Sequence, residues 1–417
     1  MRYSPWQTHR LMLQPWHRTL AIVFFAQFAM TLGFGVVFPF LPLYIAELGS
    51  STGLGVEFLA GLVFSAQAFT MMISSPIFGV LADRTSRKQI TGWGMFGVGL
   101  TMLMMGRANS AEELIFWRAM QGVVAGGISA ATALVAAAVP RQRVGFALGL
   151  VQVALWAGVA AGPLLGGVLA DARGYHFPFQ VTAVLMFTAG ISVLLGIREP
   201  VVGEEAGGET AVSARPSFWS EWWRLLTTVP MPIIFTLRFM VGLGNMIISP
   251  IAPLFIMSLL PNSSNANTLT GLVSGVGGAA STITAVYFGR LGDRIGHRTI
   301  LLVCAVAAGL FYLPQAWVTT AWQLLLLQAL TGAALGGMIT AIAALLAQHS
   351  DAGDEGSIYG LDSSVFAASR VVAPMLGAGI AAWVGLRSVF TFTGVLFLLT
   401  AVLVMRGLAV RVDGGGE

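Results

Sequence analysis

Four charged side chains lie inside the long apolar segments of this 417-residue chain, where charge is rare. Three are the arginines Arg118, Arg238 and Arg370, and Asp362 is the only acid well inside any apolar segment. A charge in hydrocarbon is costly, so such residues usually face a cavity or a partner. Desolvation and a nearby cation act in opposite directions on a carboxyl group, so Asp362 could load and release a proton near physiological pH.

Arg238 and Asp362 lie at similar depth, about two helical turns from the same predicted membrane face. We predict that these two residues and Arg118 form a proton-coupling group. The alternative is a permanent structural pair between Arg238 and Asp362. Arg370 follows Asp362 by eight positions, which is roughly 80° around a helix and ~12 Å along it. Direct contact between them is therefore not expected, and we assign Arg370 to substrate binding.

The elements that must position these charges are membrane-spanning helices. Hydrophobic residues make up 56% of the chain and charged residues 10%, and the mean hydropathy is +0.81. Soluble domains are far more polar. Runs long enough to cross about 30 Å of hydrocarbon predict twelve spans, at 18–46, 58–81, 89–107, 111–138, 144–169, 177–197, 230–259, 267–288, 299–318, 321–347, 356–382 and 386–406.

A charged signature occurs twice in short gaps between spans, and its glycines are 289 − 79 = 210 residues apart. The chain therefore reads as two homologous halves. We predict an all-helical membrane protein with a six-helix bundle at 1–197, a cytoplasmic linker at 198–229 and a second six-helix bundle at 230–417. Two parallel six-helix repeats are typical of secondary transporters, whose substrate site lies near the bilayer midplane between the halves.

The charged signature could also act as a latch between the halves, because a carboxylate there can face the positive end of a neighbouring helix. The alternative is that its charges only set topology. The predicted latch residues are Gly79, Asp83, Arg84, Arg87, Lys88, Asp293 and Arg294.

Most of the 22 Lys and Arg residues fall on one side of the predicted spans. Basic residues near span ends are retained on the cytoplasmic side. We therefore expect a multi-pass protein of the cytoplasmic membrane with both termini in the cytoplasm. The segment Trp219–Trp223 is predicted to rest in the lipid headgroups, and a protein partner for it is the alternative.

Three sequence motifs resemble those of the major facilitator superfamily. Residues 79–88 are similar to its motif A, with Ser86 where glycine is usual, and Arg118 with Gly122 resembles motif B. The run from Gly158 to Gly167 looks like motif C, the mark of the drug:proton antiporter branch. The resemblance covers nearly the whole chain. It implies proton-driven multidrug export by alternating access, with the latch stabilising the outward-facing state.

The motif C segment has glycines four residues apart, which let helix backbones approach closely, and a proline that permits a bend. We predict a hinge there, and tight packing without motion is the alternative. The predicted hinge residues are Gly158, Gly162, Pro163, Gly166 and Gly167.

Spans one, four, seven and ten are predicted to line the substrate pocket, because their aromatic, Met and amide side chains suit varied lipophilic ligands. No acid lies in the first span except Glu47 at its outer end, which leaves neutral, zwitterionic and anionic substrates open. Besides Arg370, the predicted pocket residues are Gln27, Phe34, Phe38, Gln121, Asn245, Met246, Gln328 and Thr331.

Other functions find little support in the sequence. Cys304 is the single cysteine, and the five histidines are scattered without metal-ligand spacing. We expect no metal, no cofactor, no nucleic acid and no enzymatic activity. The expected partners of a monomeric chain are a small-molecule substrate, protons and the lipid bilayer. The alternatives to an exporter are a proton-coupled importer of a small metabolite and a non-transport membrane protein.

Overall fold

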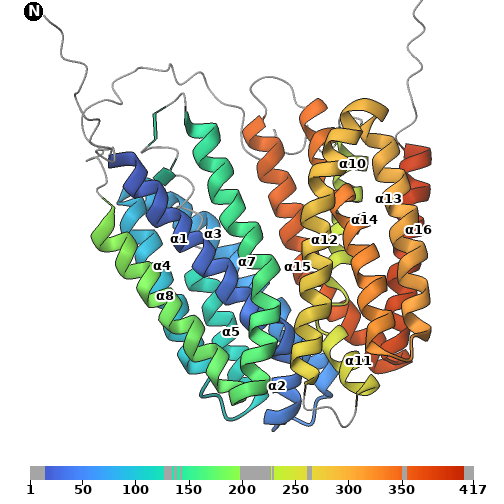
Figure 1. The fold of residues 1–417 in the computed structure, drawn as a ribbon, viewed down its shortest axis with the longest axis horizontal. Helices are drawn as coiled ribbons and strands as arrows, with labels where there is room; N and C mark the ends of the chain where they lie inside the picture. The colour runs from blue at the N-terminus through green and yellow to red at the C-terminus, as the bar shows by residue number, and fades with distance from the viewer. Residues whose placement is uncertain are drawn as a thin grey trace, which may run out of the picture.

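The computed structural model describes residues 15–125, 134–135, 139–140, 143–197, 227, 230–260, 265–349 and 355–407. The elements in these ranges are all helices. Figure 1 shows two helical bundles side by side, the first coloured blue to green and the second yellow to red. The predicted linker residues 198–226, with the Trp219–Trp223 segment, lie outside the described residues.

The first bundle begins with one long span that is broken near its C-terminal end. Pro39 and Pro42 lack backbone N–H groups; Pro39 lies in a short 3-10 turn, and Pro42 lies in the first turn of the helix that follows. The helices of this bundle are α1 (Pro15–Val37), η1 (Phe38–Phe40), α2 (Leu41–Leu48), α3 (Val56–Arg84), α4 (Arg87–Met105), α5 (Ala111–Ala125), α7 (Val144–Arg173) and α8 (His176–Gly196).

The second bundle repeats this plan, including a break in its first span around Pro250. Its helices are α10 (Met231–Met246), α11 (Ala252–Leu259), α12 (Ala266–Ile295), α13 (His297–Tyr312), η4 (Leu313–Trp317), α14 (Ala321–Gln348), α15 (Glu355–Val384) and α16 (Leu386–Gly407). Each of the twelve predicted apolar segments carries a helix. Within the described part of the chain, nine helices are long and apolar enough to cross a membrane.

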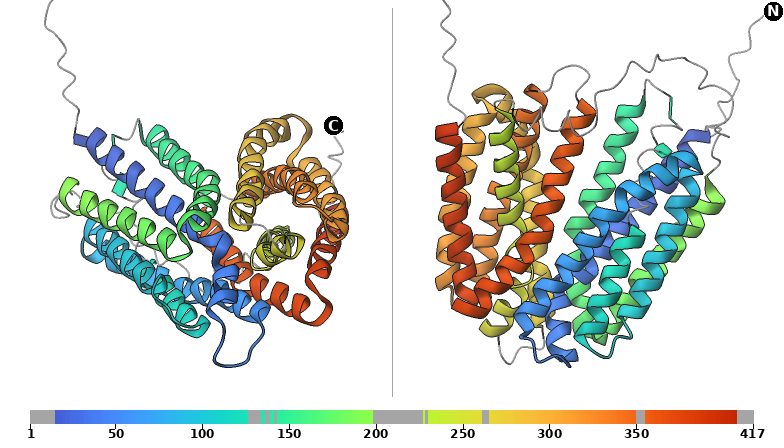
Figure 2. Two further views of the ribbon diagram at one scale, coloured as in Figure 1. Left: turned by 60° about the horizontal axis from the view of Figure 1, so that its bottom comes forward. Right: turned by 180° about the vertical axis from the view of Figure 1, so that it is seen from behind.

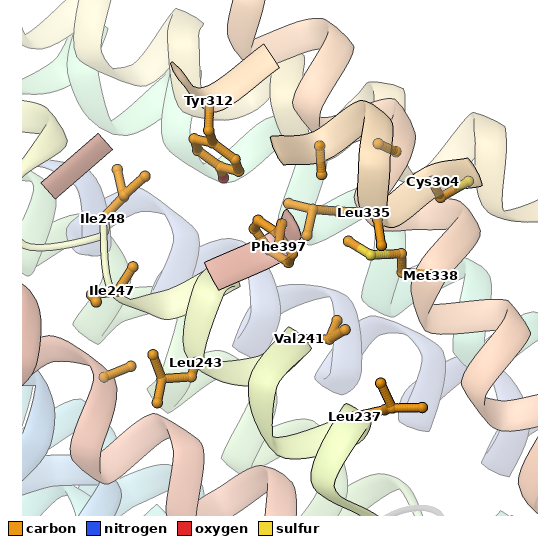
Figure 3. Close-up of a cluster of buried hydrophobic side chains, with 14 of the residues drawn as sticks. Leu237, Val241, Leu243, Ile247, Ile248, Cys304, Tyr312, Leu335, Met338 and Phe397 are labelled. Atoms are coloured by element: carbon orange, nitrogen blue, oxygen red, sulfur yellow. The ribbon is translucent and has the colours of Figure 1, made fainter. Parts of the chain in front are cut away.

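Each bundle has a hydrophobic core of its own. Buried residues between 16 and 197 form one cluster and those between 231 and 404 form another. Figure 3 shows the second cluster, in which Leu237 and Val241 of α10 approach Leu335 and Met338 of α14, with Phe397 nearby. Each bundle therefore has a core that closes without residues of the other bundle.

The bundles touch at the end opposite to the start of α1. Figures 1 and 2 show them converging toward α2 and α11 and diverging at the other end. At the convergent end Gly271 of α12 lies against the backbone of Pro163 in α7, and Gly61 of α3 lies against Pro374 and Ala378 in α15. At the divergent end, a methyl group added to Gly289 of α12 would meet nothing within 4 Å.

A carboxylate reinforces this convergent end. Asp171, in the last turn of α7, accepts hydrogen bonds from the backbone N–H of Thr268 at 2.7 Å and of Asn267 at 3.3 Å, and from the Asn267 side-chain amide at 2.8 Å. These donors belong to the first turn of α12, where free N–H groups and the helix dipole favour an anion. A residue of one bundle thus binds the helix end of the other.

We predict that Asp171→Asn weakens the contact between the bundles at this end. The amide keeps the size of the side chain but removes the charge that faces the α12 terminus, a loss of about 0.3–1 kcal/mol and up to ~2 kcal/mol if partly buried. Spin labels can replace Ser51 and Trp383, which are both exposed at this end, in a protein whose Cys304 is replaced by Ala. The distance between the two labels should then show a larger share of long values in the Asp171→Asn variant.

Glu112→Gln is the matched control, because Glu112 is hydrogen-bonded to Ser50, Ser51 and Thr52 of its own bundle and to no described residue of the other bundle. An Asp171→Asn distance distribution identical to that of the parent protein would show that Asp171 contributes nothing to this closure.

Candidate functional site

A cavity of about 520 Å³ lies between the bundles near the convergent end. Six of the predicted site residues line it, and they come from η1, α7, α10 and α14: Phe38, Pro163, Arg238, Asn245, Met246 and Gln328. Most of its wall is apolar, and the amides of Asn245 and Gln328 add polar groups. A site with this composition suits a lipophilic ligand that carries a few hydrogen-bonding groups.

Several residues of the cavity wall were not predicted from the sequence. Trp156 of α7 supplies a large aromatic surface, and Ser249, Ser274 and Ser281 supply hydroxyl groups. Trp156 precedes Gly158 of the motif C segment by two positions. This closeness to the motif is the one sequence signal that could have identified Trp156 as a cavity residue. Single serines in glycine-rich spans carry no comparable signal.

Arg238 and Asp362 form an ion pair at the edge of this cavity. Arg238 Nε lies 2.8 Å from Asp362 Oδ1, and the two side chains are 16% and 15% exposed. The Arg238 guanidinium also stacks 4.5 Å from the ring centre of Phe366, and both Arg238 and Phe366 line the cavity. α10 and α15 pack together, which explains why residues 124 positions apart meet (362 − 238 = 124). The two contacting atoms are buried, while other parts of both side chains are exposed.

The other predicted residues do not line this cavity. Arg118 is buried and donates a hydrogen bond to Gln121 Oε1 one turn further along α5. Arg370 of α15 is half-buried, and Gln27 and Thr331 are buried. The Thr331 hydroxyl donates a hydrogen bond to the backbone carbonyl oxygen of Gln328 at 3.1 Å. Thr331 therefore contacts a residue of the cavity wall without lining the cavity itself.

One further predicted pocket residue, Phe34, packs as a half-buried side chain against the core of the first bundle.

The latch signature is described only in part. The side chains of Asp83 and Arg84, and the surroundings of Gly79, lie outside the described residues, although α3 runs through all three. Ser86, where motif A usually has glycine, is the N-cap of α4 and accepts a hydrogen bond from the N–H of Gln89 at 3.2 Å.

Arg87 and Lys88 follow this cap and form the first turn of α4. In the second copy, Asp293 contacts His297 of its own bundle at 3.2 Å, and Arg294 is exposed.

The predicted hinge residues sit where α7 meets both α1 and α12. A methyl group added to Gly158, Gly162 or Gly166 would collide with the backbone of α1, and one added to Gly167 would collide with Asn267. Pro163 lies inside α7 without ending it. These contacts are those of tight packing, and the predicted hinge motion is not tested by them.

The described residues contain no group of three or more His, Cys, Asp or Glu side chains that could hold a metal ion.

Comparison with known proteins places this geometry in a family. The model of the Major Facilitator Superfamily matches residues 23–260 and again 234–414. The chain is 35% identical to the multidrug resistance protein MdtG of Enterobacter lignolyticus over 402 residues, covering 96% of this chain and 94% of the relative. It is also 35% identical to MdtG of Salmonella typhi over 392 residues, covering 93% and 94%.

Solved structures agree at the level of the fold. The nucleoside transporter NupG superimposes with a TM-score of 0.77 at 13% identity, covering 94% of this chain and all of that one. A bacterial homologue of the human lysosomal transporter Spinster, in an inward-facing conformation, superimposes with a TM-score of 0.76 at 14% identity, covering 94% and 96%.

These matches confirm the predicted fold of two parallel six-helix repeats, and they confirm a membrane transport protein rather than an enzyme. The family model and the relatives match nearly the whole length of this chain, which therefore belongs to the major facilitator superfamily.

Proposed function

We propose that this protein exports small lipophilic or amphiphilic compounds from the cytoplasm in exchange for protons, by alternating access. The observation that carries the proposal is the cavity lined by Arg238. Arg238 is paired with Asp362, the only acid well inside the predicted spans, so a titratable group lies beside a mainly apolar binding space. Relatives named as multidrug resistance proteins, 35% identical over nearly the whole chain, support the same substrate class.

The observed arrangement corresponds to one step of such a cycle. The bundles touch at the end opposite to the start of α1, and the distribution of Lys and Arg predicts that this end is external. The protein is therefore in an inward-facing state, ready to take up a compound from the cytoplasm or the inner leaflet. In the outward-facing state, the signature around Asp83 would close the cytoplasmic side, as the family resemblance implies.

Proton coupling in this proposal depends on competition at the ion pair. Deprotonated Asp362 holds Arg238 at the cavity edge. Protonation of Asp362 removes its charge and releases the guanidinium, which changes the electric field in the binding space and the preferred arrangement of α10 and α15. Arg118 remains the third predicted coupling residue. The protein acts as a monomer in the cytoplasmic membrane, with both termini in the cytoplasm.

We predict that Asp362→Asn abolishes proton-driven transport, because the amide retains size and polarity but cannot ionise. In inverted vesicles with an imposed pH gradient, accumulation of a lipophilic dye should fall at least tenfold at matched expression. Glu47→Gln, which neutralises an exposed acid at the end of α2, should leave accumulation unchanged. If the Asp362→Asn variant accumulates dye at the parent rate and still responds to a protonophore, Asp362 is not the coupling acid.

The same vesicles distinguish export from the import of a metabolite. An exporter accumulates its substrate inside inverted vesicles when their interior is acidic, because protons leave as the compound enters. A proton-coupled importer would instead require the opposite gradient and would accept a sugar or an amino acid in place of a dye.

We also predict that Phe38→Ala weakens the binding of lipophilic substrates about tenfold. Burying an aromatic side chain against a ligand contributes roughly 1.5–3 kcal/mol, and Phe38 lines the cavity while packing against Phe64 with ring centres 4.5 Å apart. The apparent KM for dye transport should rise while expression stays normal. Phe116→Ala is the control, since Phe116 is 53% exposed on the outside of α5; equal effects of the two variants would place the binding site elsewhere.

A further inference from the structure

The wall of the cavity between the bundles has a different chemistry on each side. Among the described residues, the first bundle contributes no charged, amide or hydroxyl side chain to this wall. Its wall residues are Phe38, Pro39, Trp156, Val159 and Pro163. The charged, amide and hydroxyl side chains of the wall all belong to the second bundle. A ligand in the cavity therefore meets an aromatic and apolar surface on one side and hydrogen-bonding groups on the other.

Trp156 of α7 supplies the largest flat surface on the side of the first bundle. Its side chain is half-buried, and it forms no ring contact and no hydrogen bond with the described residues. Phe38, by contrast, already packs against Phe64 with ring centres 4.5 Å apart. Stacked aromatic rings attract each other beyond what the burial of their area provides. Trp156 is therefore the wall residue best suited to distinguish an aromatic ligand from a saturated ligand of the same size.

The second bundle presents hydrogen-bonding groups that the fold leaves free. The side chains of Asn245, Ser274 and Ser281 are half-buried in the wall and form no hydrogen bond with the described residues. Gln328 Oε1 accepts a hydrogen bond from the Thr331 hydroxyl at 3.4 Å, while the Gln328 amide nitrogen has no partner in this part of the chain. Donors and acceptors are thus both available to a polar group of a ligand.

Helix α12 joins the two surfaces, because it packs against α7 of the first bundle and α14 of the second. Two adjacent glycines of α12 lie at this junction. A methyl group added to Gly278 would lie 3.9 Å from the side chain of Val159 in α7. One added to Gly277 would lie 3.2 Å from Cγ of Gln328 in α14. Residues of both bundles therefore border one continuous space, and a single ligand can contact both.

We propose that Trp156 is a specificity-determining residue, which stacks on the aromatic ring of a substrate while the second bundle binds the hydrogen-bonding group of that substrate. The inference rests on the proposed export function and specifies its substrate class as flat aromatic compounds that carry a hydrogen-bonding group. Such a ligand attaches to one bundle by stacking and to the other by hydrogen bonds. Binding therefore favours conformations in which Trp156 and Gln328 border the same cavity.

Calorimetric binding to the purified full chain in phosphatidylcholine nanodiscs tests this assignment, with empty nanodiscs as the blank. The probes are 2-naphthamide and decahydronaphthalene-2-carboxamide, which share one head group and one carbon skeleton but differ in whether the rings are aromatic. We expect the parent protein to bind naphthamide about fivefold more tightly than the saturated amide. Equal affinity of the parent protein for the two probes would overturn the proposal without any variant.

Variants then assign the two parts of the ligand to the two bundles. Trp156→Leu should remove the preference for the aromatic probe, and Trp156→Phe should retain most of it, because a phenyl ring still stacks. Gln328→Leu should weaken the binding of both probes by the same factor, roughly threefold to tenfold for one lost hydrogen bond. The control Trp93→Leu, which removes an indole that is 66% exposed on α4, should change neither the affinities nor their ratio.

The ratio of the two affinities is a readout that a merely structural role would not change. A preference for the aromatic probe that persists in Trp156→Leu, or one that Gln328→Leu abolishes, would show that the ring does not stack on Trp156. The binding assay needs no proton gradient. A clear preference without proton-driven accumulation of dye in vesicles would therefore contradict the export function and leave the binding role of Trp156 standing.

Discussion

The cost of placing charge inside a membrane governs this structure more than any single contact. The twelve apolar segments carry few charges between them, and four lie in the interior of a span. Arg238 and Asp362 neutralise each other at the edge of the cavity. Arg118 is buried in the first bundle, and its Nε and one terminal nitrogen have no hydrogen-bond partner among the described residues. The Arg238–Asp362 site is therefore neutralised within the described structure, and the Arg118 site is not.

The two sites also differ in their chemistry. The Arg238–Asp362 pair contains a carboxyl group, which can take up a proton, whereas the guanidinium group of Arg118 stays protonated at physiological pH. Asp362 and Arg370 both belong to α15, so a titratable charge and a permanent charge lie on one helix.

Much of the fold could be predicted from the sequence, because hydrophobic runs and a repeat of 210 residues are one-dimensional features. The contact between Arg238 and Asp362 was foreseeable for a similar reason, since both lie at the same depth. The lack of hydrogen-bond partners for Arg118 Nε among the described residues was not foreseeable, because it depends on which side chains of the neighbouring helices surround it. The role of Asp171 was also missed, since a carboxylate at the end of a span is ordinary until the neighbouring helix is placed. Ser86 interrupts a familiar motif, and only the structure shows it as a helix cap.

The glycine-lined contact between α7 and α12 also bears on electrical leakage through the protein. Backbone lies against backbone at Gly167 and Gly271, which leaves no room for a side chain at these two points. Protons conduct along chains of water molecules far faster than any carrier cycles. Close contacts of this kind disfavour a continuous water chain between the bundles, and a membrane that holds many copies of a transporter keeps its proton gradient only when such chains do not form.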